Sequence, residues 1–473
     1  MADKTRRPIQ FDTHMSDADA LMWNLESDPI LRSTILSTWI LDRSPDLERF
    51  TAKLERATQI IPRLRQRVIA DPLGIAPPKW ETDPHFDLRF HVRRSRVPAP
   101  GGVRDLLDLA EPIAMQAFDK DRPLWELHLV EGLEGDRCAV IMKLHHAISD
   151  GVGLVKMTEC LIERGPEDDR VLEAPVDTDT PAASPELTAW DRVGDALAHR
   201  LRERRERLGR IATALRDGAG EAARNPLDTL RQVRDTVASA GRVLAPASEP
   251  LSPIMRERST GVRFEYLPVS LAELKRAGKA VGGSVNDAFV AGVGGALARY
   301  HEALGEPAEE LRMLMPVNVR GGAKANRAGN QFAPARFEVP VGIENPAERI
   351  QAIAKLCRAQ RDEPALPWIE EITSVLGALP PAAVGGLFGA MQKTTDFTTS
   401  NVPGPRRTTW MSGAKVEGFM PFGPLAGASV NATVFSYDGT MHIGINMDPA
   451  AVTDPALLLE CFHKAFDEVL AVV

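Results

Sequence analysis

The sequence has few cysteines and no excess of positive charge, and both shortages exclude classes of protein. Four cysteines stand far apart among 473 residues without a CxxC pair, so neither a disulfide framework nor a zinc ribbon is expected. A reducing compartment is the expected setting. A net charge of −8 argues against a nucleic-acid-binding protein that works through a basic surface.

Targeting and membrane-spanning segments are also lacking. Met1 to Gln10 is charged and polar, and no apolar segment follows it, so we expect no signal peptide. The stretch Ile372–Gln392 carries no formal charge and is long enough to cross a bilayer. Because Pro380 and Pro381 would break a spanning helix, we expect two short apolar helices there instead.

The composition is that of an ordinary globular protein, with 44% apolar and 26% charged residues. Such a composition excludes a wholly disordered chain and fibrous repeats. This length and apolar content suffice for two or three sizeable cores. The pattern along the chain divides it into three zones, residues 1–164, 165–255 and 256–473. The first and third mix strands and helices, whereas the second contains a linker and helices.

In the first zone, the alternation in Trp125–Val130 and the apolar run Cys138–Leu144 predict two strands separated by a turn. A helix over Val152–Ile162 should follow, with Ser149 or Asp150 as its N-cap.

The second zone begins with Pro166–Pro185, whose Asp, Pro, Thr and Ala content indicates an exposed linker. Apolar residues then recur at helical spacing from Trp190 to Leu215, with arginines crowding the other face. This helix could lie on an anionic lipid surface, or it could pack over the domains with a solvated basic face. Ile372–Gln392 is the other candidate for lipid contact, and a second helix is expected over Leu227–Val243.

The third zone has clear local signals for its helices and strands. Ser270 should cap a helix over Leu271–Ala280 that ends at Gly282–Gly283, and Ser284 or Asn286 should begin the next helix. The further expected elements are strands at Val262–Val269, Met313–Val317 and Gln331–Val339, a helix at Pro346–Gln360, a hairpin formed by Ala432–Tyr437 and Met441–Met447, and a helix at Pro455–Leu470. Two α/β domains meeting across a cleft follow from this arrangement.

The densest group of chemically active residues is His145-His146-Ala147-Ile148-Ser149-Asp150-Gly151, at the end of a predicted buried strand. Because the backbone turns there, one histidine can face the interior while the other faces a cleft. A neutral imidazole can take a proton from an alcohol. Asp150 could cap the helix or hold the turn through an arginine, and Gly151 lets the backbone bend.

The histidine pair has two other interpretations, a metal site and a structural pair. Adjacent histidines on a strand splay apart, so no metal site is expected. A purely structural histidine pair remains an alternative.

Other catalytic motifs are missing from the sequence. Two segments beginning at Gly282 and Gly427 lack the final glycine of a serine-nucleophile elbow, and no phosphate-binding loop is present. Gly292, Gly294 and Gly295 fall within a predicted helix, where close packing is the expected reason for them.

Five motifs together give a family resemblance. His145 to Gly151 matches HHxxxDG, and the other matches are Met15–Leu21 (an MSxxDA pattern), Pro123-Leu124-Trp125-Glu126 (PLWE), Asn286-Asp287 (ND) and Ser400 to Pro405 (SNVPGP). In this order, they span nearly the whole chain. The chain resembles the bacterial wax ester synthase/acyl-CoA:diacylglycerol acyltransferases, within the CoA-dependent acyltransferase superfamily.

The resemblance implies an α/β fold with mixed sheets: two chloramphenicol-acetyltransferase-like domains with the active site at their interface. By analogy, His146 is the general base, His145 supports it, and Asp150 and Gly151 are structural. Asn286 is the candidate for stabilising the transition state at the carbonyl, with helix capping as its alternative role. Trp125 and Pro123 should shape the hairpin, and Asn401 should serve packing.

The implied enzyme is an O-acyltransferase that moves a long-chain acyl group from acyl-CoA to diacylglycerol or a long-chain alcohol, without an acyl-enzyme. Acyl-CoA is a co-substrate and no bound cofactor is expected. We expect a cytoplasmic protein, peripheral on the inner membrane face or on lipid droplets. The alternatives are a non-catalytic lipid-binding or droplet protein, and an acyltransferase of the same superfamily with another donor or alcohol.

Overall fold

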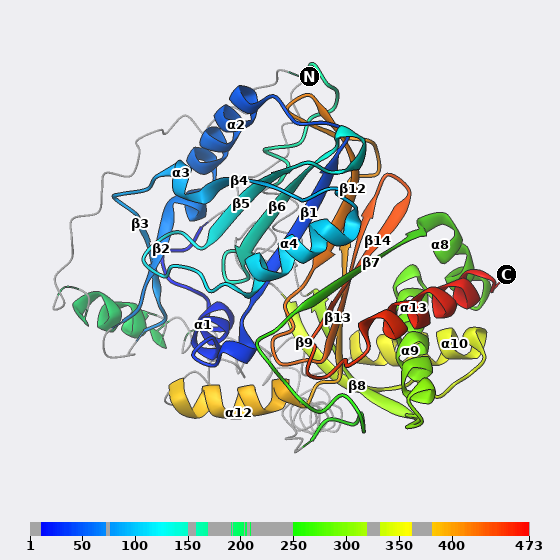
Figure 1. Ribbon diagram of the computed structural model, residues 1–473. Helices are drawn as coiled ribbons and strands as arrows, with labels where there is room; N and C mark the ends of the chain where they lie inside the picture. Colours follow the sequence, from blue (N-terminus) through cyan, green and yellow to red (C-terminus); the bar gives the residue numbers. More distant parts are fainter. Residues whose placement is uncertain are drawn as a thin grey trace, which may run out of the picture.

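The computed structural model describes residues 11–71, 76–149, 158–168, 191, 193–202, 204–205, 209, 249–318, 332–361 and 381–472. In these ranges the chain forms two six-stranded sheets with helices packed on them (Figure 1). Each sheet mixes parallel and antiparallel neighbours. The predicted α/β class with mixed sheets is therefore confirmed.

The N-terminal sheet has β6 (Cys138–His145) near its centre, the strand that the apolar run predicted. The strand order is β11-β12-β1-β6-β5-β4. The other strands are β1 (Thr34–Leu41), β4 (Val92–Arg96), β5 (Trp125–Glu131), β11 (Trp410–Met411) and β12 (Ala414–Phe422). Successive residues of β6 face opposite sides of the sheet. Accordingly, Val140 packs in the core with α2 (Leu47–Ile60), whereas Ile141 packs with α4 (Val103–Met115).

Smaller elements surround this sheet. They are α1 (Asp17–Leu25), α3 (Leu88–His91) and a two-stranded sheet of β2 (Gln66–Ile69) and β3 (Lys79–Thr82), with 3₁₀ turns at Pro29–Leu31, Pro62–Arg65 and Glu134–Asp136. Ser16 caps α1, because its hydroxyl accepts a hydrogen bond from the backbone N–H of Asp19. α1 packs against α12 (Pro381–Lys393), which comes from the far end of the chain.

The C-terminal sheet contains the predicted hairpin, β13 (Val430–Tyr437) and β14 (Thr440–Met447). The strand order is β7-β14-β13-β10-β8-β9. The other strands are β7 (Arg263–Ser270), β8 (Glu310–Asn318), β9 (Phe332–Pro340) and β10 (Phe397–Pro403). In Figure 1, its helices lie together on one side: α8 (Leu271–Ala280), α9 (Val285–Ala303), α10 (Pro346–Arg361) and α13 (Pro455–Leu470).

The glycines of α9 allow close helix packing, as the sequence predicted. A Cβ atom on Gly292 would lie 2.6 Å from the ring of Phe466 in α13. A Cβ on Gly295 would lie 2.5 Å from the Arg349 guanidinium of α10. Both distances are shorter than van der Waals contact, so these helices could not approach α9 if either glycine carried a side chain.

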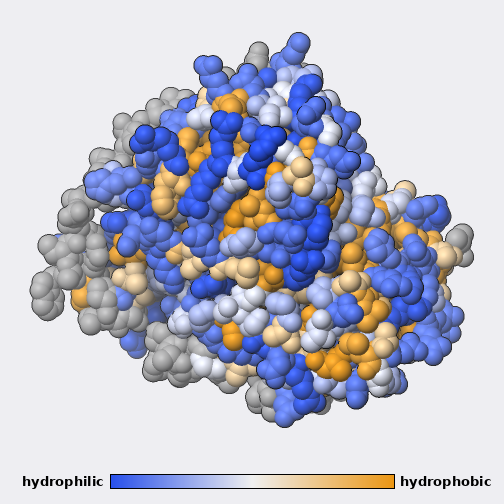
Figure 2. All heavy atoms as spheres, viewed as in Figure 1, coloured by the Kyte–Doolittle hydropathy of each residue, from blue (hydrophilic) through white to orange (hydrophobic). Residues whose placement is uncertain are grey.

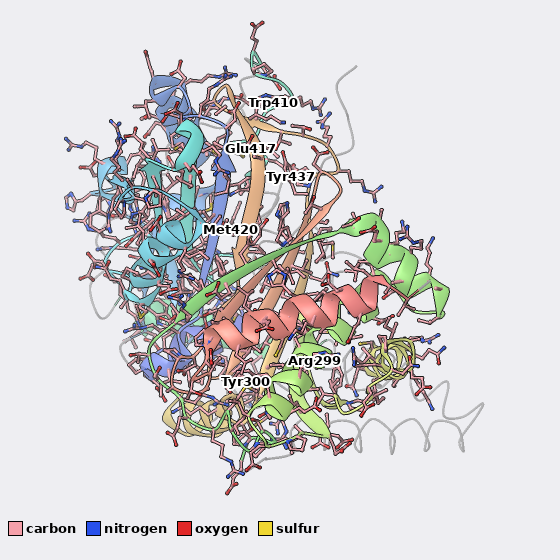
Figure 3. All side chains as sticks on the ribbon, turned by 45° about the vertical axis from the view of Figure 1, so that its right-hand side comes forward. Arg299, Tyr300, Trp410, Glu417, Met420 and Tyr437 are labelled. Atoms are coloured by element: carbon pink, nitrogen blue, oxygen red, sulfur yellow. The ribbon has the colours of Figure 1, made fainter. Side chains whose placement is uncertain are left out.

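One segment crosses between the two halves of the chain. β12 follows β10 in sequence, yet it pairs antiparallel with β1 in the N-terminal sheet. It also contacts β13 and β14 of the C-terminal sheet. The Tyr437 hydroxyl donates to Val416 O over 3.0 Å and accepts from Thr409 N over 2.9 Å. Figure 3 shows Tyr437 beside the run of labelled residues from Trp410 to Met420. The last part of the chain therefore completes the first sheet.

Gly444 makes the crossing of β12 and β14 possible because glycine has no Cβ atom. A Cβ on Gly444 would lie 1.7 Å from Pro421 O. Nearby, Tyr266 Oη lies 2.6 Å from Nδ1 of the buried His442. Burial lowers the pKa of His442 to about 4, so this imidazole is neutral at physiological pH.

Charged side chains join α4 to β7 at the other side of the same junction. Arg104 Nη1 donates to Phe264 O over 2.6 Å and lies 3.1 Å from Glu265 Oε1. The backbone N–H of Phe264 donates to Glu111 over 3.0 Å. The Phe264 ring stacks on Phe422 of β12, with 4.1 Å between centroids. The two halves thus meet through both apolar and charged contacts.

Several predicted elements lie outside the described residues: most of Val152–Ile162 and of the linker Pro166–Pro185, the helix at Leu227–Val243, and residues 372–380 of the apolar stretch. Residues 381–393 form α12. Within the described ranges, no helix combines the length and the apolar character needed to cross a membrane.

Candidate active site

The histidine pair lies where β6 leaves the N-terminal sheet. His145 is the last residue of β6, pairs with Thr34 of β1, and donates its backbone N–H to Leu124 O over 3.0 Å. The backbone N–H of His146 donates to Ser33 O over 2.8 Å. A turn follows, closed by a hydrogen bond from Ile148 N to His145 O. The backbone on both sides of the pair is therefore fixed by hydrogen bonds.

The His145 side chain is fully buried, and its surroundings fix its protonation. Nδ1 accepts a hydrogen bond from the backbone N–H of Ala147 over 3.0 Å, so the ring proton must sit on Nε2. Nε2 lies 2.9 Å from Glu26 Oε1. The rings of Trp23 and Phe118 meet the imidazole edge-on, at centroid distances of 5.6 and 6.1 Å. His145 is thus held through Nδ1, with Nε2 beside the Glu26 carboxylate.

Glu26 is a site residue that the sequence analysis did not identify. It caps the C-terminus of α1, and its Oε1 also accepts the backbone N–H of Ser33 over 2.8 Å. Burial alone would raise the pKa of Glu26, but the contacts with His145 and Ser33 hold it below its ordinary value. Because 119 residues separate Glu26 from His145, no local pattern in the sequence could have connected them.

His146 differs from its neighbour in exposure. Its side chain is half-buried, whereas those of His145, Ala147, Ile148 and Ser149 are buried. The expectation that one histidine faces the interior holds for His145, and a cleft at His146 stays a prediction. Asp150 and Gly151 lie outside the described residues, so the structure describes the motif only as far as Ser149.

Trp125 of the PLWE block is buried in the hairpin that β5 forms with β6. Its Nε1 donates to Leu64 O over 2.8 Å, and its ring stacks on His91 with 4.5 Å between centroids. These contacts connect β5 to the residues before β2 and to α3. Trp125 therefore shapes the hairpin through packing.

A buried charge cluster lies on the sheet face that His145 shares. Lys143 is fully buried, donates to Gln116 O over 2.7 Å, and lies 3.9 Å from Glu126 Oε2. Burial lowers the pKa of Lys143 to about 8, although Glu126 opposes that shift. Glu126 also lies 3.2 Å from Arg93 and 3.3 Å from His128, so its charge is well compensated.

Asn286 lies at the start of α9 but does not cap it. The cap is Ser284, whose hydroxyl accepts the N–H of Asp287, while the Asp287 carboxylate accepts the N–H of Ser284. The Asn286 side chain reaches outward from the helix. Its Oδ1 accepts from Asn401 Nδ2 over 3.2 Å, and its Nδ2 lies 3.9 Å from Met315 Sδ. The capping alternative for Asn286 is therefore wrong.

The structure thus brings the site residues into two groups. Glu26, Ser33, His145 and His146 form one at the end of β6, and the ND and SNVPGP motifs meet in the other through Asn286 and Asn401. Within the described ranges, no three His, Cys, Asp or Glu residues converge as metal ligands would.

A serine–histidine contact elsewhere does not form a nucleophilic site. Ser252 Oγ lies 2.7 Å from His301 Nε2, and both side chains are completely buried. The same Oγ accepts the backbone N–H of Met255 over 2.8 Å, and His301 Nδ1 lies 2.7 Å from Leu297 O. This pair anchors the segment before β7 to α9.

Comparison with protein families gives two matches that together span most of the chain. Residues 15–289 match the wax ester synthase/diacylglycerol acyltransferase catalytic domain, and residues 328–469 match the WS/DGAT C-terminal domain. A Mycobacterium tuberculosis (strain H37Rv) protein, described by its name as a candidate diacylglycerol O-acyltransferase, is 37% identical over 476 residues. That alignment covers 100% of this chain and 94% of the relative.

Solved structures share the fold. The wax ester synthase/diacylglycerol acyltransferase from Marinobacter aquaeolei VT8 superposes with a TM-score of 0.60 at 22% identity, covering 97% of this chain and 98% of that one. The first condensation domain of the calcium-dependent antibiotic synthetase, in complex with a substrate analogue, gives a TM-score of 0.63 at 16% identity, covering 97% and 95%. These likenesses confirm the predicted two-domain acyltransferase fold.

Proposed function

Since the chain belongs to the wax ester synthase/diacylglycerol acyltransferase family, it is an O-acyltransferase, and we propose that it moves a long-chain acyl group from acyl-CoA to diacylglycerol or a long-chain alcohol. We place its active site between the halves formed by residues 1–164 and 256–473, at the histidine pair. The observation that carries the proposal is the contrast between a buried His145 and a half-buried His146 at the turn after β6.

His146 acts as the general base in the proposed mechanism. Its imidazole takes the proton of the acceptor hydroxyl as the oxygen attacks the thioester carbonyl carbon. The tetrahedral intermediate collapses when the C–S bond breaks, and the imidazolium returns the proton to the leaving CoA thiolate. The products are an ester and free CoA. No acyl-enzyme is needed because the thioester is already activated.

The other motif residues support this step. His145 holds the turn, and Asp150 and Gly151 shape it. Asn286 offers its amide Nδ2 to the developing oxyanion. The hydrogen bond from Asn401 supports this role, because it occupies Oδ1 of Asn286. Nδ2 carries two N–H groups, so it can donate to an oxyanion besides its contact with Met315 Sδ.

CoA release tests the proposed activity. Purified protein receives palmitoyl-CoA with diacylglycerol, with hexadecanol or with no acceptor, and free thiol is measured. Wild type should release CoA in an acceptor-dependent way, and His146→Ala should lose at least about 100-fold in rate. His85→Ala, which alters an exposed histidine, is the matched control and should behave as wild type. Lipid binding without CoA release across a broad acceptor panel would favour a non-catalytic lipid-binding protein.

For the lipid surface, we propose that the helix around residues 193–202 contacts an anionic membrane or droplet. Asp195 lies 2.8 Å from Lys79 of β3, and His199 stacks on His14, so one helix face is turned to the protein. Leu197 and Leu201 lie on the opposite face and are 52% and 59% exposed. On the face seen in Figure 2, hydrophobic residues occur in separate patches between hydrophilic ones. An exposed leucine pair on a helix with exposed arginines is the pattern that binds anionic interfaces.

Vesicle flotation tests this contact. Leu197→Asp/Leu201→Asp should lose binding to vesicles that contain phosphatidylglycerol. Leu304→Asp, at an exposed leucine after α9, is the control and should bind as wild type does. Equal binding of all three proteins would contradict the proposed surface.

A further inference from the structure

Glu26 touches both supports of the histidine pair through a single oxygen. Oε1 lies 2.9 Å from His145 Nε2 and accepts the backbone N–H of Ser33 over 2.8 Å. The carbonyl of Ser33 in turn accepts the backbone N–H of His146 over 2.8 Å. Glu26 therefore contacts the His145 ring directly. It is linked through one residue, Ser33, to the hydrogen bond that holds the His146 backbone.

The protonation states suit this arrangement. His145 Nδ1 is an acceptor, so Nε2 carries the ring proton, and it lies 2.9 Å from Glu26 Oε1. The lowered pKa of Glu26 keeps that carboxylate ionised at neutral pH. A close contact with the His145 ring and a backbone hydrogen bond from Ser33 thus converge on one carboxylate oxygen, and neither partner can move without disturbing the other.

The segment that carries Glu26 is anchored at two further points. It ends α1, which packs against α12. Two residues later, Asp28 lies 2.5 Å from Lys393 at the end of α12. Both halves of the chain therefore fix the position of Glu26. Through His145 and Ser33, Glu26 in turn holds the turn after β6 in place.

We propose that Glu26 is a positioning residue for acyl transfer: it sets the orientation of His146 through Ser33 and His145 without touching substrate. The inference rests on the proposed role of His146 as general base. It differs from a role in folding alone because it requires the acceptor geometry of Oε1. Displacement of a catalytic base by about 1 Å can lower a rate by about 100-fold.

Three substitutions separate geometry from charge. Glu26→Gln removes the charge but keeps an oxygen that can accept from Ser33 N and lie against His145 Nε2, so kcat should stay within about 5-fold of wild type. Glu26→Asp keeps the charge but shortens the side chain, and Glu26→Leu removes both. These two should lower kcat by about 30- to 100-fold, with the KM for palmitoyl-CoA within about 3-fold of wild type.

A matched control accounts for loss of stability. Glu163 is a buried carboxylate with contacts to Arg49 and Lys53, and it accepts the N–H of Gly413, at the opposite end of the N-terminal sheet from Ser33. Glu163→Leu should lower the melting temperature but leave kcat per folded molecule unchanged. Should Glu26→Leu fail to fold, Glu26→Gln against Glu26→Asp still decides the question.

The outcomes are distinct. Wild-type kcat in Glu26→Leu or Glu26→Asp overturns the positioning role, and so does a Glu26→Gln variant as inactive as Glu26→Leu. If His146→Ala, assayed in parallel, keeps full activity, the proposed general base itself fails. If His146→Ala is inactive while all Glu26 variants are active, only the positioning role fails.

Discussion

Asn401 on β10 donates a hydrogen bond from Nδ2 to Oδ1 of Asn286 at the start of α9, over 3.2 Å. The two residues belong to motifs separated by 115 positions in the sequence. One amide therefore orients the other: as long as Asn401 donates, Asn286 presents its NH₂ group away from β10.

This relationship predicts the effect of changing Asn401. Asn401→Asp places a carboxylate oxygen against Asn286 Oδ1, so the Asn286 amide must turn over and withdraw its donor. We expect kcat to fall about 10-fold or more, and Asn401→Ala should cost about 3- to 10-fold. Single-turnover CoA release would measure both. Wild-type rates in both variants, with Asn286→Ala impaired, would show that Asn286 acts without Asn401.

His442 predicts part of the response of stability to pH. Its pKa of about 4 in the folded protein is below its ordinary value of 6.5, so the unfolded chain binds the proton more tightly. Stability should therefore fall as the pH drops from about 6.5 towards 4, by about 2 kcal/mol at pH 5 from this group. His442→Gln should lose correspondingly less stability between pH 7 and pH 5 in urea unfolding. An identical loss in both proteins would contradict the assignment.

Arg104 predicts how strongly the charged contacts hold the two halves together. Arg104→Ala removes the donor to Phe264 O and leaves Arg263 as the charged partner of Glu111 and Glu265 among the described residues. We expect the free energy of unfolding to fall by about 1–3 kcal/mol. Arg94→Ala breaks only an exposed pair with Glu131 and should cost less than about 1 kcal/mol. Equal urea midpoints for the two variants would show that the α4–β7 contact adds little.

Gly444 marks a very close approach between the two sheets. In Gly444→Ala, the new methyl group would have to displace the Pro421 carbonyl, since the unrelaxed distance is 1.7 Å. A loss of about 3 kcal/mol or more in unfolding free energy is expected, with a lower melting temperature. Gly165→Ala, where a Cβ meets no atom within 4 Å, should change stability by less than about 0.5 kcal/mol. If Gly444→Ala had the same melting temperature as wild type, the strands would be able to separate at little cost in free energy.

Local signals in the sequence predicted much of the fold. Ser270 and the glycines after α8 fixed both ends of that helix, and the Asp438-Gly439 turn between alternating strands fixed the β13–β14 hairpin. In each case, the information lies within a few neighbouring residues. The buried strand before His145 was likewise visible as an apolar run.

Long-range partners could not be predicted in the same way. The pairing of β12 with β1 and the contact of Glu26 with His145 each join residues more than 100 positions apart. The helix around Leu197 shows a different limit, because an apolar stripe reveals that a helix has two faces but not which one meets the protein. For Asn286, the sequence offered two cap candidates, Ser284 and Asn286, and the structure shows that Ser284 forms the cap through a capping box with Asp287.

The exchange of β12 also bears on how the chain reaches its folded state during synthesis. β12 supplies the second neighbour of β1, and it ends at residue 422 of 473. Until the ribosome has released that residue, one edge of β1 has no partner strand from this chain. The sheet that carries the histidine pair is therefore completed only after β12 has been synthesised, and an exposed strand edge is a site where other chains can pair.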